Sequence, residues 1–419
     1  MSAGAGGPTI VAVDAMTILD SRGSPTLRAF TRLSDGSLGV ASAPSGKSTG
    51  KRERLDLRDG GREFAGRGVQ NAIDNVRGPI SLTLCGQGVS DPVAIDRALV
   101  ELDGTPDRSY LGANATVAVS MSVWRALAQS NREPLWKTLA QNPPAGLPVP
   151  LFNVINGGAH AKGGLQLQEF MLVPHGLPTT RDRIRCGSEV YAELRACFAE
   201  AGMSTAVGDE GGFVYTGQRV KDAITMLCAA IERSGYCVGE EVALAIDAAA
   251  NGFRNQDGTY SPEVGRRLSS EEMCDWWCEL VEDAPVVMLE DPLDEDDVKG
   301  WELLTRRLES HVTIVGDDIF VTDPARIRWA VHEGIANAVL LKPNQIGTVS
   351  ETIQAWQEAR RAGYKTVVSH RSGETCDAFI SDLAVGIGSD YLKAGALARS
   401  ERTEKYNRLL EIEREMRVS

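Results

Sequence analysis

The stretch VALAID (242–247) is the first of five short apolar runs that each end in an ionisable side chain. The others are VVMLE (286–290), TIVGD (313–317), AVLLK (338–342) and TVVSH (366–370). Four or five consecutive apolar residues are the length of a strand buried in a parallel sheet. After the first interval the runs recur about every 25 residues, which is enough for one strand, one helix and two loops. The pattern predicts an α/β fold, a (β/α)8 barrel with its active site at the carboxyl ends of the strands.

The composition excludes several classes of protein. Of the 419 residues, 42% are hydrophobic and 24% are charged, which is typical of a soluble globular chain long enough for two domains. No apolar run has the length of a transmembrane helix, and no signal-peptide pattern is present, so we expect no membrane partner. Eight scattered cysteines predict reduced thiols and a cytoplasmic protein. The net charge of −13 argues against nucleic acid as a partner.

The N-terminal part of the chain has a different pattern from the rest. Alternating segments around the turn SDG (34–36) predict a small antiparallel sheet, and three helical stretches follow it. The proline-rich segment QNPPAGLPVP (141–150) suits a domain boundary. We therefore expect an N-terminal α+β domain over residues 1–140 and the barrel over residues 141–419, with strand–helix alternation from Leu151 onward.

Three of the ionisable residues at the predicted strand ends are carboxylates, namely Asp247, Glu290 and Asp317. Three converging anions repel one another, and a hard divalent cation bound through oxygen usually resolves that repulsion. Zinc would prefer histidine or cysteine, so these residues favour Mg2+. The alternative is that the carboxylates cap the helices that follow their strands. All three carboxylates and Lys342 stand at the same position, directly after an apolar run, and this favours the metal site over helix capping.

The remaining ionisable residues can supply an acid and a base. Lys342, close to a divalent ion and to Lys393, can have a lowered pKa and serve as a base, and its alternative role is a salt bridge to the carboxylates. Glu210, in the glycine-rich GDEGG loop, can pair with Glu169, so that the raised pKa of one member makes it an acid.

Other residues are suited to bind a phosphate. His370, Arg371 and Ser372 are consecutive, and their guanidinium and hydroxyl pair well with phosphate oxygens. The segment PSGKSTGK (44–51) matches half of a nucleotide-binding P-loop, but Ala41 replaces the first glycine of that motif, which argues against a nucleoside triphosphate. A metal, a base, an acid and a phosphate holder together predict proton abstraction next to a carboxylate, through a metal-stabilised enediolate.

At these residues the sequence resembles the enolase family over essentially its whole length. The segments that carry the resemblance occur in the family's order and include DSRGSPT (20–26), PSGKSTG (44–50), NVINGGAH (153–160), VGDEGG (207–212), EDP (290–292), LLKPNQIGT (340–348), VSHRSGET (368–375) and ARSER (398–402). The resemblance implies a modified (β/α)8 barrel of enolase type with an N-terminal α+β domain, in a homodimer or a higher homo-oligomer. It also implies a hydro-lyase that removes water from 2-phosphoglycerate, a small phosphorylated carboxylate, to give an enolpyruvate.

The resemblance also implies a role for each residue of the site. Two Mg2+ ions are expected in the active site, the first held by Asp247, Glu290 and Asp317 and the second by Ser48 and the substrate phosphate. Lys342 would remove the C2 proton, and Glu210, supported by Glu169, would protonate the leaving C3 hydroxyl. The other expected catalytic residues are His160 and His370. The expected substrate contacts come from Ser45 and Ser48 of the PSGKSTG loop, from Arg371 and Ser372 on the phosphate, and from Lys393 on the carboxylate.

Some positions depart from the family pattern. Lys47 replaces an alanine in the loop that closes over the phosphate, and Arg28 replaces an acidic residue of the dimer interface. The ionisable residues of the expected site are all present, whereas residues around them differ from the family pattern. This combination favours a divergent paralogue that resembles carboxyphosphonoenolpyruvate synthases of phosphonate natural-product biosynthesis. Lys47 would then bind the extra carboxylate of a phosphonylated substrate, or else pair with an acid such as Glu53. The alternative from another class is a non-catalytic binding protein of the enolase fold.

Overall fold

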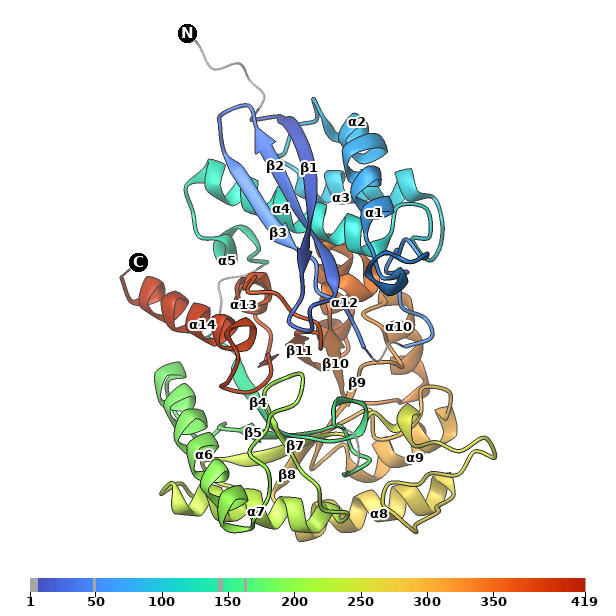
Figure 1. Cartoon of the computed structure of the whole chain (residues 1–419), viewed down its shortest axis with the longest axis vertical. Helices are drawn as coiled ribbons and strands as arrows, with labels where there is room; N and C mark the ends of the chain where they lie inside the picture. The colour runs from blue at the N-terminus through green and yellow to red at the C-terminus, as the bar shows by residue number, and fades with distance from the viewer. Residues whose placement is uncertain (1–6, 48–49, 142–145, 162–163, 419) are drawn as a thin grey trace.

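The structure is a computed structural model of the chain, and it describes residues 7–47, 50–141, 146–161 and 164–418. A small N-terminal domain lies against one end of a larger barrel domain (Figure 1). No helix in these described ranges is both long enough and apolar enough to cross a membrane.

The N-terminal sheet has three antiparallel strands in sequence order, β1 (Ile10–Leu19), β2 (Pro25–Leu33) and β3 (Leu38–Ser42). The predicted SDG turn joins the second and third of these strands. Apolar side chains such as Val13 and Ala15 are buried, whereas their neighbours along β1 are exposed. The sheet therefore packs on the helices through one face only.

The helices of this domain follow the sheet, and local signals explain their ends. Asp91 caps α3 by accepting hydrogen bonds from the backbone N–H groups of Val93 and Ala94, and Gly104 ends the helix with a left-handed backbone. The fourth helix is buried on nearly all sides because it lies between the sheet and the barrel. The helical segments are η1 (Glu63–Gly66), α1 (Gln70–Asn75), η2 (Val76–Ile80), α2 (Ser81–Leu84), α3 (Pro92–Asp103), α4 (Ala113–Asn131) and α5 (Leu135–Thr138).

Eight strands close into the barrel, in the spatial order β12-β11-β10-β9-β8-β7-β5-β4, with β12 pairing back onto β4. The two-residue strand β6 (Phe213–Val214) pairs in parallel with the carboxyl end of β4. The barrel strands are β4 (Val149–Asn156), β5 (Glu169–Val173), β7 (Ala243–Asp247), β8 (Val286–Glu290), β9 (Thr313–Gly316), β10 (Ala338–Leu341), β11 (Lys365–Ser369) and β12 (Tyr391–Lys393).

The expected strand–helix alternation does not begin at Leu151. The β4 and β5 strands are antiparallel to each other, β5 is antiparallel to β7, and only from β7 onward do the strands run parallel. The described residues between β4 and β5 contain only the short η3 (Gly158–His160) and none of the α-helix that usually connects parallel neighbours, so the chain turns straight back. Two helices, α6 (Thr180–Glu200) and α7 (Val220–Arg233), with the two-residue β6 between them, then follow β5 before the regular alternation starts.

Helices such as α12 (Val349–Arg361) bury one apolar side against the strands, whereas all eight residues of α13 (Phe379–Gly386) are buried. The interior of the barrel, below the strand ends, is filled by apolar side chains from adjacent strands around the ring, including Leu151, Met171, Ala245, Met288 and Val367. The helical segments of this domain are η3 (Gly158–His160), α6 (Thr180–Glu200), α7 (Val220–Arg233), η4 (Ala250–Gly252), α8 (Ser270–Asp283), α9 (Val298–Leu308), α10 (Pro324–Glu333), α11 (Pro343–Ile346), α12 (Val349–Arg361), α13 (Phe379–Gly386) and α14 (Ser400–Val418).

The contact between β3 and α4 depends on a glycine. A Cβ atom at Gly39 would lie 1.8 Å from the carbonyl oxygen of Ser122 and 2.6 Å from the backbone nitrogen of Ala126. We therefore expect Gly39→Ala to push the sheet off the helix and to destabilise the protein by about 1–3 kcal/mol, measured as a lower Tm. Gly88→Ala is the matched control, because a Cβ there meets nothing within 4 Å. Equal Tm values for the two variants would contradict this packing.

Candidate active site

Strand register brings three carboxylates into one row at the carboxyl end of the barrel. Glu169 begins β5 and lies opposite Asp247, the last residue of β7, because these two strands are antiparallel. Asp247 in turn lies opposite Glu290, the last residue of β8. All three side chains are buried. The apolar runs that end in ionisable side chains predicted Asp247 and Glu290 as neighbours, and the antiparallel β5 adds Glu169 to them.

One ammonium group neutralises part of this row. The Nζ atom of Lys393, at the end of β12, lies 2.8 Å from Glu290 Oε2, 2.9 Å from Glu169 Oε2 and 3.0 Å from Asp247 Oδ2. Burial alone would lower the pKa of Lys393, but Asp247, Glu169 and Glu290 outweigh it and raise that pKa well above its usual range. Lys393 is therefore a cation throughout the physiological pH range.

A second buried ion pair lies next to the first. Lys342 Nζ is 2.5 Å from Asp317 Oδ2, and the Gln345 side chain donates a hydrogen bond to Asp317 Oδ1 at 2.8 Å. Burial is the largest single influence on the pKa of Lys342 and lowers it, as expected for a base, but the net effect with the Asp317 and Glu290 carboxylates is a raised pKa. The expected lowering of the Lys342 pKa is therefore not present in this arrangement, because its nearest neighbour is an anion.

The three predicted metal ligands have the right chemistry for a hard divalent cation. Asp247, Glu290 and Asp317 offer only oxygen donors, and burial together with neighbouring carboxylates raises the pKa values of Asp247 and Glu290. A cation would relieve that repulsion. Among the described residues, however, the triads with ligand atoms within 4.8 Å of one another are Asp291–Asp317–Asp318 and His160–Glu169–Glu210. The predicted set is divided because Asp247 and Glu290 face Lys393, whereas Asp317 faces Lys342.

The opposite wall of the site is built around Glu210. Its Oε2 atom accepts a hydrogen bond from Asn153 at 2.8 Å and lies 3.6 Å from His160 Nδ1 and 3.7 Å from His370 Nε2. Burial and the neighbouring Glu210 carboxylate raise the pKa of Glu169 to about 7. Burial lowers the pKa values of both histidines, so both are neutral at physiological pH. The predicted carboxyl pair is present, and Glu169 is its member with the raised pKa.

The predicted phosphate residues lie at the junction of the two domains. Arg371 makes a bidentate ion pair with Glu53, with distances of 2.8 and 3.1 Å. Ser372 Oγ accepts a hydrogen bond from Arg22 at 3.2 Å, and the same guanidinium donates to Ser45 Oγ at 2.9 Å. Sequence reasoning missed Arg22, although it lies in the DSRGSPT segment, because a turn residue has no periodic signal that would place it in a site.

The loop residue Lys47 has a partner on the barrel. Its Nζ lies 2.8 Å from Asp209 Oδ2, and both side chains are partly exposed. The acid that pairs with Lys47 is thus the neighbour of Glu210 and not Glu53, which faces Arg371. Ser48, the expected ligand of a second ion, lies outside the described residues.

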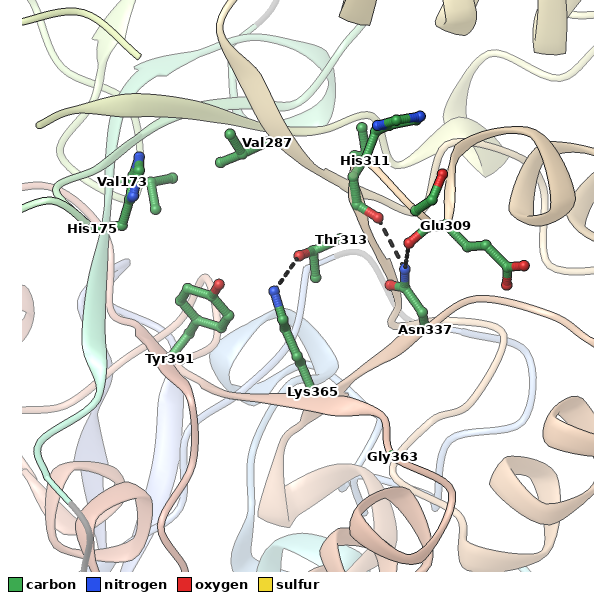
Figure 2. Close-up of a pocket in the computed structure, with 12 residues that line it drawn as sticks. Val173, His175, Val287, Glu309, His311, Thr313, Asn337, Gly363, Lys365 and Tyr391 are labelled. Carbon is green, nitrogen blue, oxygen red and sulfur yellow. Dashed lines mark hydrogen bonds between the residues drawn. The ribbon is translucent and has the colours of Figure 1, made fainter. Parts of the chain in front are cut away.

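A separate cavity of about 450 Å³ lies at the other end of the barrel (Figure 2). Thr313, Lys365 and Tyr391 line it where their strands begin, and Lys365 Nζ donates to Thr313 Oγ1 at 3.2 Å. The Asn337 side chain donates to the carbonyl groups of Glu309 and Val312 (Figure 2). These polar groups bond one another at the amino ends of the strands, whereas barrel enzymes place their chemistry at the carboxyl ends. The smaller cavity lined by Glu210, Lys342 and Lys393 is the candidate active site.

This arrangement defines a class of enzyme. A barrel with oxygen ligands for a divalent cation beside a buried lysine is typical of metal-dependent enzymes that remove a proton next to a carboxylate. Residues 10–139 match the enolase N-terminal domain, and residues 144–418 match the enolase C-terminal TIM barrel domain. The chain belongs to the enolase family, whose members typically use Mg2+ and bind a phosphorylated carboxylate.

The family membership confirms the predicted fold and type of reaction. The protein is a hydro-lyase that removes water from 2-phosphoglycerate or a close analogue to give an enolpyruvate. The fold is the predicted enolase-type barrel with an N-terminal α+β domain. The enzyme prediction is therefore confirmed over the alternative of a non-catalytic binding protein.

The role of Lys393 in compensating buried charge can be measured. In EDTA at pH 8, Lys393→Met leaves three carboxylates without their ammonium, so we expect a loss of about 3–5 kcal/mol in the free energy of unfolding and a lower Tm. At pH 5.5 the loss should be smaller, because the raised pKa values of Asp247 and Glu290 let these groups take up protons. Lys365→Met, at the exposed end of β11, is the control. A loss that is independent of pH would contradict the electrostatic explanation.

Proposed function

We propose that Lys342 removes the C2 proton of 2-phosphoglycerate and that Glu210 protonates the leaving C3 hydroxyl. The observation that supports this division is that both residues line one small cavity from different sides of the barrel. Lys342 follows β10, whereas Glu210 is bonded to Asn153 of β4, with β11 and β12 between these strands. A substrate in the cavity can therefore meet a base on one face and an acid on the other.

The base must lose its proton before it can act. Asp317 is the main group that keeps Lys342 protonated. A divalent cation bound by Asp247, Glu290 and Asp317 would offset the charge on Asp317 and polarise the substrate carboxylate, which makes the C2 proton more acidic. Lys393, whose ammonium already contacts carboxylates, would bind the carboxylate of the substrate.

The acid side has a proton available at neutral pH. With a pKa of about 7, Glu169 is partly protonated there, and its proton is shared with the neighbouring Glu210. His160 and His370 surround the pair as neutral rings, and their burial keeps water away from the leaving group. The pair can therefore deliver a proton to the C3 hydroxyl and recover it after product release.

The remaining assignments belong to the same proposal. Arg371 and Ser372 would hold the phosphate, with Ser45 fixing the loop beside them through its hydrogen bonds to Asp20 and Arg22. Ser48 would contribute to a second Mg2+, giving two ions in each site. We also propose that the two domains meet between residues 140 and 141 and that the protein is a homodimer or a higher homo-oligomer.

A second candidate substrate is a carboxyphosphono analogue of the kind used in phosphonate natural-product biosynthesis. Lys47 supports it, because an ammonium stands beside the loop that carries Glu210, and 40% of its side chain is exposed. A carboxylate on phosphorus could replace Asp209 as the partner of Lys47. The ion pair with Asp209 already gives Lys47 a role without such a ligand, so 2-phosphoglycerate is the first choice.

The two half-reactions should separate in variants. Lys342→Ala is expected to abolish exchange of the C2 proton with solvent deuterium, because the base is lost. Glu210→Gln should spare that exchange and block departure of hydroxide, with at least a hundredfold loss in turnover. Proton NMR of 2-phosphoglycerate in D2O with Mg2+ measures exchange, and absorbance of the enolpyruvate measures turnover. Equal loss of exchange in both variants would show that the roles are assigned wrongly.

Lys47 distinguishes the two candidate substrates. If the carboxyphosphono analogue is the substrate, Lys47→Ala should lower kcat/KM for that compound about tenfold or more and leave 2-phosphoglycerate turnover unchanged. Asp209→Asn is the matched control, because it removes the other half of the ion pair and keeps the ammonium. Equal effects of Lys47→Ala on both substrates would leave 2-phosphoglycerate as the substrate.

A further inference from the structure

Arg402, in the first turns of α14, is completely buried beside the active site and was not predicted as a functional residue. Its Nη1 atom lies 2.6 Å from His370 Nδ1 and donates to the carbonyl oxygen of Arg371, also at 2.6 Å. Its Nη2 atom donates to the carbonyl oxygens of Ser372 at 2.6 Å and Asp209 at 3.1 Å. One guanidinium thus contacts the segment with the phosphate residues, the segment with Glu210, and a histidine between them.

The contact with Arg402 determines which nitrogen of His370 carries the proton. A guanidinium has only donors, so Nδ1 of His370 must be the acceptor. A neutral imidazole that accepts at Nδ1 carries its proton on Nε2. That nitrogen faces Glu210 Oε2 at 3.7 Å. Arg402 therefore directs an N–H group toward the acid of the proposed reaction.

The surroundings of His370 also keep it neutral. Burial, Arg402, Lys393, Lys405 and Lys342, in that order, hold its pKa well below the usual range. Arg402 and Lys405 lie on α14, Lys393 ends β12 and Lys342 follows β10, while Arg371 is the next residue in the chain. The carboxylate that faces the ring is Glu210. All five of these causes disfavour the imidazolium, and the first-named cation, Arg402, contacts the ring directly.

We propose that Arg402 is a positioning residue that fixes His370 as the neutral, Nε2-protonated tautomer. It also holds the segment of Arg371 and Ser372 in a fixed position relative to the loop that carries Glu210. The inference rests on the proposed function, because it assigns His370 and Glu210 to the departure of the C3 hydroxyl. Its expected effect falls on that half-reaction. Removal of the C2 proton by Lys342 depends on Arg402 only indirectly, because the short hydrogen bonds of Arg402 go to the 370–372 segment and to Asp209.

The tautomer can be tested in the wild-type protein. Long-range 1H–15N NMR separates the two ring nitrogens, and the chain has only five histidines to assign. The proposal expects His370 to show a protonated Nε2 and an unprotonated Nδ1 from pH 5.5 to pH 8.5. A ring with its proton on Nδ1, or one that titrates in this range, would overturn the proposal without any variant.

Variants test the role in the reaction. Arg402→Gln can still donate to Nδ1 but removes the charge, so we expect the pKa of His370 to rise above its value in the wild type and the acidic limb of the rate profile to move to higher pH. Turnover should fall at least tenfold while exchange of the C2 proton stays within about threefold. Arg402→Lys, which keeps the charge but has fewer donors, should keep His370 neutral and recover part of the turnover. Should Arg402→Gln fail to fold, Arg402→Lys and the wild-type spectra still decide the question.

Arg408→Gln is the matched control on the same helix, since Arg408 pairs with Asp382 away from the site. It should change neither the spectrum of His370 nor turnover. Equal loss of exchange and turnover in Arg402→Gln, with an unchanged His370 spectrum, would show that Arg402 acts only through stability. A changed tautomer without selective loss of dehydration would instead keep the positioning and reject the proposed role of Glu210.

Discussion

The compensation of buried charge at one end of the barrel is the constraint on which the site depends. Three carboxylates lie side by side on adjacent strands, each too deeply buried to be solvated by water, and Lys393 contacts all three. Such a row is stable only if cations face it, and the barrel supplies them from strands on its other side. The same arrangement suits the site to a divalent cation and an anionic substrate. A cation could replace Lys393 as the partner of the carboxylates, and an anionic substrate could replace the carboxylates as the partner of Lys393.

The N-terminal domain contributes directly to the site. Glu53 holds both terminal nitrogens of the Arg371 guanidinium, and Asp20 and Arg22 fix Ser45 beside Ser372. The side of the cavity proposed to hold phosphate is therefore formed where the two domains meet, whereas the row of carboxylates belongs to the barrel alone. A change that displaces the small domain would disturb Arg371 and Ser372 before it disturbs that row.

Much of this architecture could be predicted from the sequence, because apolar runs that end in ionisable residues have a direct structural meaning. The runs ending at Asp247, Glu290 and Lys342 indicated both the parallel strands and the side chains at their ends. The antiparallel direction of β5 relative to β4 and β7 could not be predicted in this way. A strand buried on both sides, such as β4, has the same continuous apolar pattern whichever way its neighbour runs. The contacts of Arg22 and Arg402 were missed for another reason. Arg22 lies in a turn and meets Ser372 across 350 residues, and Arg402 lies at a helix start and meets Ser372 across 30 residues, so neither contact has a local pattern.

The closure of the barrel by β12 has a consequence for synthesis of the chain on the ribosome. The last strand of the barrel pairs with the first, Tyr391 with Val149, so the ring stays open until β12 has emerged. Lys393 arrives with that strand, whereas the carboxylates of Glu169, Asp247 and Glu290 are translated well before it. A nascent chain that lacks β12 therefore cannot complete the barrel or neutralise its acidic row. Late, long-range closure of this kind makes folding slow and leaves a partly made chain dependent on protection from aggregation.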